Sequence, residues 1–407
     1  MKQKIYDVVI VGGGPAGSSC AIHLAKSGYQ VAVVDKDIFP RDKICGDGLT
    51  TYVLYELNQL GADIKNDFIN RDFYNPSKGL RIFSPGGYEV FVYDIVKNQY
   101  NNNLFFICRR KDFDYFLWDR LGKFDNISTF ESYKVIDVKT TNREVKVSSG
   151  KDSITAKVLV GADGANSIVK RKIFNTGHDW HSTMLTAQAY YKNLNLINKD
   201  VIEAHMIKDL LPGGFWIFPM QNNVANVGFG MMLEDYHKNN MNLKKLFSEI
   251  IFNNPILNKK FEKSEIFSNI NIRILPLVNK LKNISADRVL LTGDAIPVVH
   301  RITGEGIGEA MNSGRIAAKV IDRCLIHDNF SREYMGSYDL DIRKKFGKMV
   351  KMSKGLQKVF SSSFMLDRIC KNISSKPKLQ MQLESIAKDP SNYYKLFNPY
   401  LYYRMLL

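Results

Sequence analysis

The segment GGGPAG has the glycine spacing of a loop that holds a diphosphate. Gly12, Gly14 and Gly17 fit G-x-G-x-x-G, and the apolar run at 8–11 predicts a buried strand just before them. Gly12 permits the tight turn, Gly14 lets the backbone approach a pyrophosphate, and Gly17 allows close packing of helix on strand. The helix that follows offers free N–H groups and a partial positive charge to the phosphates.

An acidic residue at the end of a second strand completes this unit. Apolar residues at 31–34 lead into Asp35, whose carboxylate can accept hydrogen bonds from an adenosine ribose. Gly28 stands where the intervening helix is expected to end. The combination predicts an ADP-containing cofactor, and the unit by itself fits NAD and FAD alike.

A lone cysteine in RDKICGDGLT stands between a basic stretch and two glycines. Gly46 and Gly48 leave the backbone bare enough to touch a ligand. Cys45 could shape a pocket, hydrogen-bond near a reacting atom or act as a modest acid. The alternative is a buried small hydrophobe, the usual setting of a free cysteine.

The composition is that of a folded protein of two or three domains, with 407 residues, 45% apolar and 24% charged. The five cysteines are odd in number and form no C-x-x-C pair, so we expect no disulfide framework and no metal site. The first residues enter a strand too soon for a cleavable signal peptide, and no apolar stretch reaches the ~18 residues of a spanning helix. A cytoplasmic location is expected.

The net charge of +16 is concentrated near the C-terminus. Residues 341–380 hold eleven Lys/Arg against two Asp, with apolar residues interleaved. Such a segment either lies on an anionic membrane surface, on the inner face of the membrane, or forms a solvated helix face. Nucleic-acid binding is not expected, because no reading module is present.

Three further motifs follow in order. They are R-x-x-F-D-x-x-L from Arg110 to Leu117, a strand running into Asp163-Gly164, and a strand running into Gly293-Asp294 with a helix expected to open at about Gly304. Taken by itself, each of these motifs could be a common turn or a surface feature. Together with the glycine fingerprint, their order and spacing resemble the FAD-dependent oxidoreductases of the para-hydroxybenzoate hydroxylase fold, over residues 5 to about 325.

Within that group the chain is most similar to the geranylgeranyl reductase family. FPRDKICGDGL, at 39–49, is similar to the family's basic-then-Cys-Gly loop. LPGGFWIFPMQNNVANVGFG, at 211–230, is similar to its aromatic-Trp-aromatic-Pro strand followed by an N-V-G-x-G strand.

The resemblance implies a set of cofactor contacts. Arg110 would lie near the pyrophosphate, Asp294 would bind the ribityl chain, and the loop at 303–306 would present N–H groups to the pyrimidine edge of the flavin, where a helix N-terminus stabilises negative charge. The implied FAD-binding residues are Gly12, Gly14, Pro15, Ala16, Gly17, Asp35, Lys36, Cys45, Gly46, Arg110, Asp163, Gly164, Gly293, Asp294, Gly304, Glu305, Gly306 and Ile307.

The implied catalytic residues are Cys45, Gly46, Trp216 and Arg301. The resemblance places Cys45-Gly46 beside the flavin on the substrate side. Trp216 and Phe218 stand two apart on an expected strand and would share one face, lining an apolar tunnel or belonging to the core.

The chain departs from the family before its T-G-E-G-I stretch, where it has His300-Arg301 in place of the common Asn-Pro. Arg301 either pairs with an anionic substrate group or forms a surface salt bridge. His300 is expected to be structural. The departure leaves the usual isoprenoid substrate open to question.

The predicted fold is α/β, with a Rossmann-like FAD-binding domain interleaved with an antiparallel substrate sheet, plus C-terminal helices. The FAD-binding domain is expected in three parts (1–75, 101–170 and 281–330). The substrate domain is expected as an insertion at 76–100 and as 171–280, and a helical region at 331–407, with its Tyr-rich end, would follow.

These features predict an FAD-dependent reductase of carbon–carbon double bonds in an apolar, prenyl-type lipid substrate. One dinucleotide fingerprint is visible, so NAD(P)H docks transiently or a separate donor protein supplies the electrons. The alternatives are a flavin monooxygenase of aromatic substrates, a halogenase, whose W-x-W-x-I-P motif is replaced by GFWIFP, and a membrane-surface flavoprotein that binds a lipid without turnover.

Overall fold

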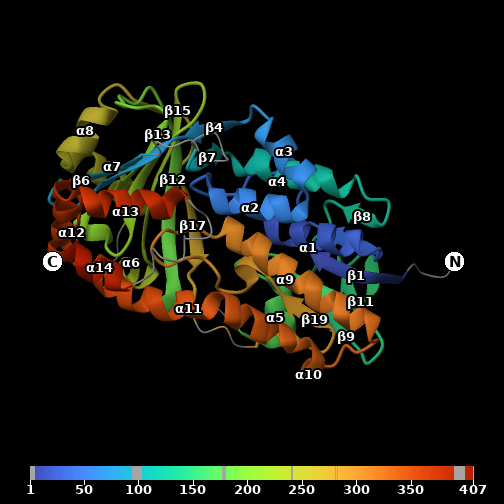
Figure 1. Cartoon of the computed structure of the whole chain (residues 1–407). Coiled ribbons are helices and arrows are strands. Elements are labelled where there is room, and N and C mark those ends of the chain that lie inside the picture. The colour runs from blue at the N-terminus through green and yellow to red at the C-terminus, as the bar shows by residue number, and fades with distance from the viewer. Residues whose placement is uncertain are drawn as a thin grey trace.

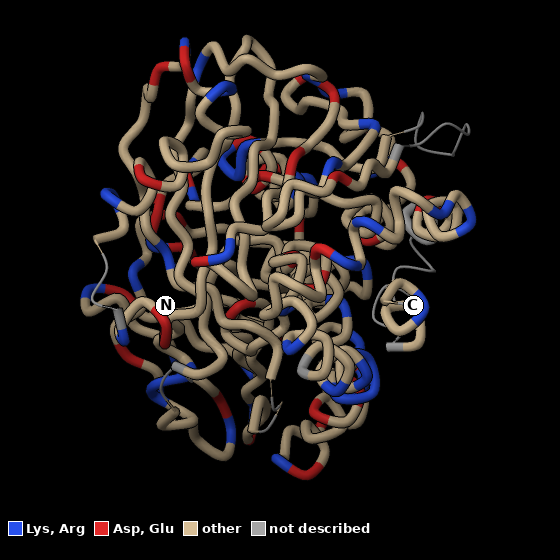
Figure 2. Tube along the Cα trace, turned by 90° about the vertical axis from the view of Figure 1, so that its left-hand side faces the viewer, with Lys and Arg blue, Asp and Glu red and all other residues tan. Residues whose placement is uncertain are grey.

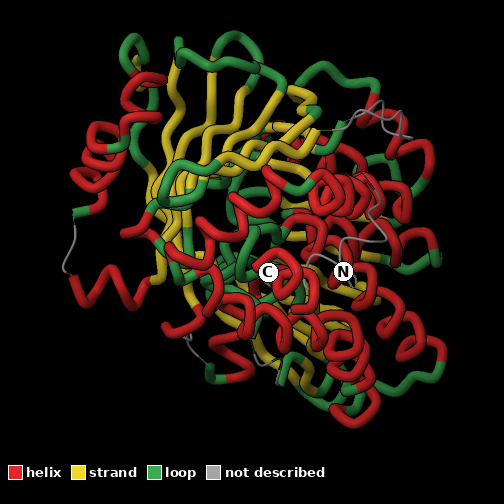
Figure 3. The backbone as a smooth tube through the Cα atoms, turned by 60° about the vertical axis from the view of Figure 1, so that its left-hand side comes forward, coloured by secondary structure: helices red, strands yellow, loops and turns green. Residues whose placement is uncertain are grey.

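The computed structural model describes residues 5–93, 103–176, 180–239, 242–279, 281, 283–388 and 399–406. Two β-sheets organise the molecule, and helices pack around them (Figure 1). Figure 3 shows the strongly twisted second sheet beside the helix-rich part of the molecule that holds the first. The predicted α/β fold with an interleaved second sheet is confirmed, and that sheet is antiparallel except where residues 79–83 and 201–205 pair in parallel.

The first sheet follows the order β18-β19-β11-β1-β2-β8, with β10 and β9 added beside β11. Its strands are β1 (Ile5–Val11), β2 (Val31–Val34), β8 (Ile127–Phe130), β9 (Asp137–Thr140), β10 (Val145–Ser148), β11 (Ser153–Gly161), β18 (Ser285–Ala286) and β19 (Val289–Leu291). β1 pairs in parallel with β2 and β11, and β11 pairs in parallel with β19. The loops that follow these four strands therefore open at one edge of the sheet.

Helices enclose this sheet. They are α1 (Pro15–Lys26), α2 (Thr51–Leu60), α3 (Ala62–Ile69), α4 (Arg110–Leu121), α5 (Ile168–Phe174) and α9 (Ile307–Ile326), with a short 3-10 turn at Gly293–Ala295. α1 lies against α9, so closely that a Cβ on Gly314 would stand 2.2 Å from the carbonyl oxygen of Ala16.

The predicted start of α9 at about Gly304 is wrong by about one turn. The helix begins at Ile307, after a turn in which the N–H of Gly304 donates to the carbonyl of His300. Gly304 has a φ of +69°, which is outside the helical region.

The second sheet follows the order β16-β12-β15-β14-β13-β5-β6, and β17 pairs with β12. Its strands are β5 (Gly79–Phe83), β6 (Glu89–Tyr93), β12 (Thr183–Lys192), β13 (Val201–His205), β14 (Gly214–Pro219), β15 (Val224–Met232), β16 (Glu265–Ile266) and β17 (Asn271–Pro276). β14 alternates strictly: Phe215 and Ile217 are buried in a core with α7 (Leu243–Asn253) and α8 (Pro255–Phe261), while Trp216 and Phe218 face the other way and are half-buried.

A small sheet joins the two larger ones. It pairs β7 (Phe105–Cys108) with β3 (Gly48–Thr50) and β4 (Tyr74–Ser77). β5 and β6 come from the segment predicted as an insertion, of which residues 94–100 lie outside the described part of the chain.

Helices at the C-terminal end complete the molecule. They are α10 (Arg332–Met335), α11 (Ser337–Phe360), α12 (Ser363–Ser375), α13 (Pro377–Lys388) and α14 (Pro399–Leu406), and α6 (Leu233–Asn239) follows β15. α11 runs from the core of the first sheet, where Tyr338 and Phe346 are buried, toward the second sheet (Figure 1). α12 and α14 share a core with Val90 and Val92 of β6. Residues 389–398, which include the first part of the Tyr-rich end, lie outside the described part of the chain.

Candidate active site

Loops from separate motifs meet at the carboxyl edge of the parallel strands. Gly12, after β1, has a φ of +106°, and a Cβ there would lie 2.3 Å from the carbonyl oxygen of Ala162 after β11. A Cβ on Gly293, after β19, would lie 2.8 Å from the Cβ of Ala16 in α1. Asp35, after β2, accepts a hydrogen bond from the N–H of Gly13 (2.8 Å). These loops therefore form one continuous site.

Two helices begin at this site without a side-chain cap. Gly14 precedes α1, which opens with Pro15, and Gly306 precedes α9, which opens with Ile307. The first N–H groups of each helix have no partner within the helix. Both helix ends are thus available to an anionic or electron-rich group.

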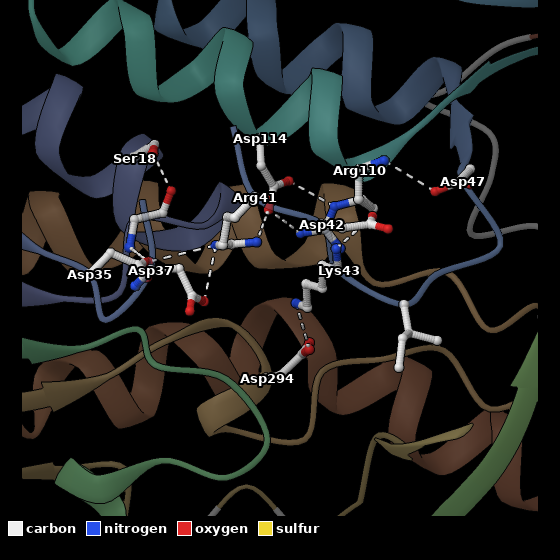
Figure 4. A network of polar contacts seen from close by, with 12 residues as sticks. Ser18, Asp35, Asp37, Arg41, Asp42, Lys43, Asp47, Arg110, Asp114 and Asp294 are labelled. Carbon is white, nitrogen blue, oxygen red and sulfur yellow. Dashed lines mark hydrogen bonds and ion pairs between the residues drawn. The ribbon is translucent and has the colours of Figure 1, made fainter. Parts of the chain in front are cut away.

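Four cationic side chains converge on the same edge, and Figure 4 shows three of them. Arg110 binds both carboxylate oxygens of Asp114 at 2.7 Å, and Arg41 binds Asp114 at 2.9 Å. Lys43 and Arg273 approach Asp294 at 3.3 and 3.2 Å. Arg273 comes from β17 of the second sheet, so both sheets contribute to this cluster.

Burial and charge shift the pKa values within this cluster. Burial lowers the pKa of Lys43 to about 8, although the carboxylate of Asp294 opposes that shift. Burial by itself would raise the pKa of Asp294, but Lys43 and Arg273 hold it below its ordinary value. The site is therefore an environment in which a carboxylate, or another anion, is strongly favoured.

The donors and acceptors at this edge fit FAD. Arg41, Lys43 and Arg273 and the uncapped start of α1 suit a diphosphate. Asp163 caps α5 through one oxygen, which accepts from the N–H of Ile168 at 2.6 Å, while its other oxygen is buried without a hydrogen-bond partner among the described residues. That oxygen is suited to a ligand hydroxyl.

The loop at 43–48 bridges this edge and the second sheet. A Cβ on Gly46 would lie 3.3 Å from the ring of Phe218 and 3.6 Å from the indole nitrogen of Trp216, and one on Gly48 would lie 3.1 Å from Phe218. The two rings are 6.3 Å apart on the shared face that the sequence predicts. The loop thus lies directly on an aromatic surface, with Cys45 half-buried beside it.

The remaining predicted cofactor residues occupy varied positions. Lys36 is exposed, and Gly164 has a φ of +78° in the turn before α5. Glu305 accepts a hydrogen bond from the hydroxyl of Thr50. Whether each of these residues contacts the cofactor stays a prediction.

Arg301 is buried, so the predicted surface salt bridge is wrong, whereas its pairing with an anionic substrate group stays a prediction. It is 6% exposed, and its guanidinium donates to the carbonyl of Val278, the amide oxygen of Gln357 and the hydroxyl of Ser182 at 2.6 to 2.8 Å. These contacts link α11 to the residues just after β17 and just before β12. His300 has the structural setting that was expected, since its Nδ1 accepts from the N–H of Thr303 (3.2 Å) in the turn before α9.

Sequence reasoning missed several residues of the site. Arg41 and Lys43 belong to the basic stretch just before Cys45, which was the available signal, but their partners could not be identified from the sequence. Arg273 belongs to no recognisable sequence motif, and it reaches the site only because β17 pairs with β12. Asp47, between the two glycines, was also not singled out.

Comparisons with known proteins agree with this geometry. A family model described as an FAD binding domain matches residues 5–325. A digeranylgeranylglycerophospholipid reductase of Methanocella arvoryzae is 30% identical over 370 residues, covering 88% of each chain. A menaquinone reductase of Mycobacterium tuberculosis is 29% identical over 330 residues, covering 78% of this chain and 76% of its own length.

The fold also has a counterpart among solved structures. A geranylgeranyl bacteriochlorophyll reductase-like protein of Thermoplasma acidophilum superposes with a TM-score of 0.80 at 23% identity, covering 92% of each chain.

Proposed function

The chain belongs to the geranylgeranyl reductase family of FAD-dependent oxidoreductases, and we propose that it reduces carbon–carbon double bonds in the isoprenoid chain of a lipid. The named relatives act on such lipids: one is a digeranylgeranylglycerophospholipid reductase and another a menaquinone reductase. The observation that carries the proposal is the contact of the loop at 43–48 with Trp216 and Phe218. It joins an apolar aromatic surface to the edge that fits FAD.

FAD, when bound and reduced, supplies a hydride to one carbon of the double bond, and a proton must reach the other carbon. The uncapped start of α9 stabilises negative charge on the ring system. Trp216 and Phe218 hold the apolar chain and keep water away from it. Cys45 is the proposed neighbour of the reacting carbons, and its thiol is one candidate source of the proton.

The electrons come from outside the chain. The sequence holds a single G-x-G-x-x-G fingerprint, which the FAD site uses. We therefore propose that NAD(P)H docks transiently or that a donor protein delivers the electrons.

The C-terminal helices favour a peripheral contact with an anionic membrane. Exposed apolar side chains, Phe364 (73% exposed), Met381 (65%) and Tyr403 (57%), lie on α12, α13 and α14 at one end of the molecule (Figure 1). Lys and Arg are frequent on the coils around the C-terminus (Figure 2). Lys376 and Lys378, where α12 ends and α13 begins, are exposed. Among the described residues, no helix is long and apolar enough to cross a membrane. This combination suits a protein that draws its substrate from the bilayer surface.

Product analysis tests the proposed function. The FAD-loaded protein, with a chemical reductant, would be incubated with digeranylgeranylglycerophospholipid or with menaquinone in detergent micelles. After air has returned any quinol to the quinone, mass spectrometry should show the gain of two hydrogens in the isoprenoid chain for each reduced double bond in at least one of these lipids, and no gain without the protein. Unchanged lipids together with an oxygen-dependent hydroxylated aromatic product would assign the monooxygenase function instead.

A further inference from the structure

Asp47 is a buried acid in the loop that carries Cys45. It stands between Gly46 and Gly48, and it is 0% exposed. Its φ of +62° is left-handed, a conformation that aspartate adopts more readily than most residues. At this turn its carboxylate points into the protein, where a charge is costly unless several donors surround it.

One set of hydrogen-bond donors to Asp47 comes from α4 and from the small sheet. An oxygen of the Asp47 carboxylate accepts from the backbone N–H of Arg110, the first residue of α4, at 3.1 Å (Figure 4). The backbone carbonyl of Asp47 accepts from the N–H of Cys108, the last residue of β7, at 2.9 Å.

The other set comes from the second sheet. The second carboxylate oxygen accepts from the hydroxyl of Tyr190 on β12 and from the side-chain amide of Asn226 on β15, both at 2.7 Å. The same amide donates to the carbonyl of Cys45 at 2.8 Å, and its oxygen accepts from the indole N–H of Trp216 at 2.9 Å. Both amide hydrogens and the amide oxygen of Asn226 are thus engaged.

We propose that Asp47 is a positioning residue, whose carboxylate fastens the Cys45-Gly46 loop to β12, β15 and Trp216 and so sets the distance between substrate and reducing centre. A carboxylate suits this place because it only accepts hydrogen bonds, and three hydrogen-bond donors point at it. Its consequence for catalysis rests on the proposed function, whereas the fastening of the loop does not.

Protonation of Asp47 would weaken this fastening. Burial raises the pKa of Asp47 to about 6, against the opposing effect of its hydrogen bonds from Tyr190 and Asn226. The titratable and charged groups around it are Tyr190 of β12, Arg110 of α4 and Cys108 of β7, with Arg109 stacked over the Tyr190 ring at 4.9 Å. A proton on the carboxyl converts an acceptor into a donor, so the loop should loosen as the pH falls below about 6.

Alkylation of Cys45 measures this loosening without turnover. Cys45 is the half-buried one of the five free cysteines, and the other four are buried. In the FAD-loaded protein at neutral pH, Asp47→Asn should raise the iodoacetamide labelling rate of Cys45 about tenfold and lower single-turnover hydride transfer about a hundredfold. Tyr190→Phe, the milder variant if Asp47→Asn does not fold, should shift both rates in the same directions, by less.

Tyr29→Phe is the matched control, because the Tyr29 hydroxyl also donates to an aspartate, Asp322, at 2.8 Å but lies outside the site. It should change neither rate.

The wild-type rate of hydride transfer should fall below about pH 6, and Asp47→Asn should abolish this decrease at low pH. Unchanged labelling and transfer in both Asp47→Asn and Tyr190→Phe would overturn the inference. So would a loss of FAD binding with an unchanged rate for each bound flavin. If wild type reduced no lipid, altered labelling alone would support the loop fastening while the proposed function failed.

Discussion

Gly46 shows how a single residue controls the approach of loop and aromatic strand. A methyl group at Gly46 would meet Phe218 at 3.3 Å, which is tighter than most side-chain contacts, and it would also lie close to Trp216. Gly46→Ala should therefore displace the loop and lower the rate of lipid reduction about tenfold, while the protein keeps its FAD. Single-turnover kinetics, with the rate expressed per bound flavin, would measure the change in rate.

Gly347→Ala, on α11, is the control for that substitution. A Cβ at Gly347 meets nothing within 4 Å, so its rate should equal that of wild type. Equal rates for both variants would contradict the placement of Gly46 against the reacting substrate.

Lys43 gives the site a pH dependence. Its pKa of about 8 in the folded protein is below the ordinary value of 10.5 because of burial. Between these two values the unfolded chain binds the proton and the folded chain does not, so the stability of the FAD-free protein should rise with pH through that window. A diphosphate favours the charged form, so FAD affinity should fall as the pH rises above about 8.

Titration with FAD on either side of pH 8 would measure that change in affinity. Lys43→Met should weaken FAD binding about tenfold at neutral pH, through loss of a charge-assisted contact, and should flatten the pH dependence. An affinity that falls just as steeply in Lys43→Met would show that another group is responsible.

At the scale of elements, the turn before α9 depends on His300. Burial lowers the pKa of His300 to about 3, so the ring is neutral near pH 7 and its Nδ1 accepts from the N–H groups of Ile302 and Thr303. His300→Leu should lower the free energy of unfolding by about 1–3 kcal/mol, because two N–H groups lose their acceptor. His300→Asn, which keeps an acceptor, should cost less. Urea denaturation would show the order, and equal losses in the two variants would contradict this role.

The elements that the sequence predicted well are those whose signals are local. The unit β1–α1–β2 follows from apolar runs, glycine spacing and Asp35, all within one short stretch. The start of α9 was misplaced because a turn closed by His300 competes with the helix. The contacts of Asp294 with Lys43 and Arg273 could not be predicted, since they depend on how the second sheet packs against the first.

At the scale of the whole molecule, the C-terminal end should bind anionic vesicles. A lysine near an anionic surface contributes about 1 kcal/mol, so the double substitution Lys376→Glu and Lys378→Glu should lower vesicle partitioning at least about tenfold. Sedimentation with vesicles that contain an anionic lipid would measure this, with purely zwitterionic vesicles as the background. Lys139→Glu with Lys146→Glu, exposed on β9 and β10 at the far end, should leave binding unchanged (Figure 1). Equal losses from both pairs would indicate a general charge effect without a defined contact.

We propose that the first sheet holds FAD and that the second sheet holds the lipid against it. Arg273 and Asn226, both from the second sheet, reach the loop at 43–48. The rate of the reaction is therefore expected to depend on how the two sheets pack against each other as well as on the residues within each sheet.

Anaerobic reoxidation of the reduced, FAD-loaded protein is the direct test of double-bond reduction by this chain. After reduction by a measured amount of dithionite, flavin absorbance would be followed on mixing with an unsaturated isoprenoid lipid or with its fully saturated counterpart. We expect a rapid return of the oxidised spectrum with the unsaturated lipid and none with the saturated one. A flavin that stays reduced with every isoprenoid lipid, and returns only when oxygen and an aromatic substrate are added, would contradict it.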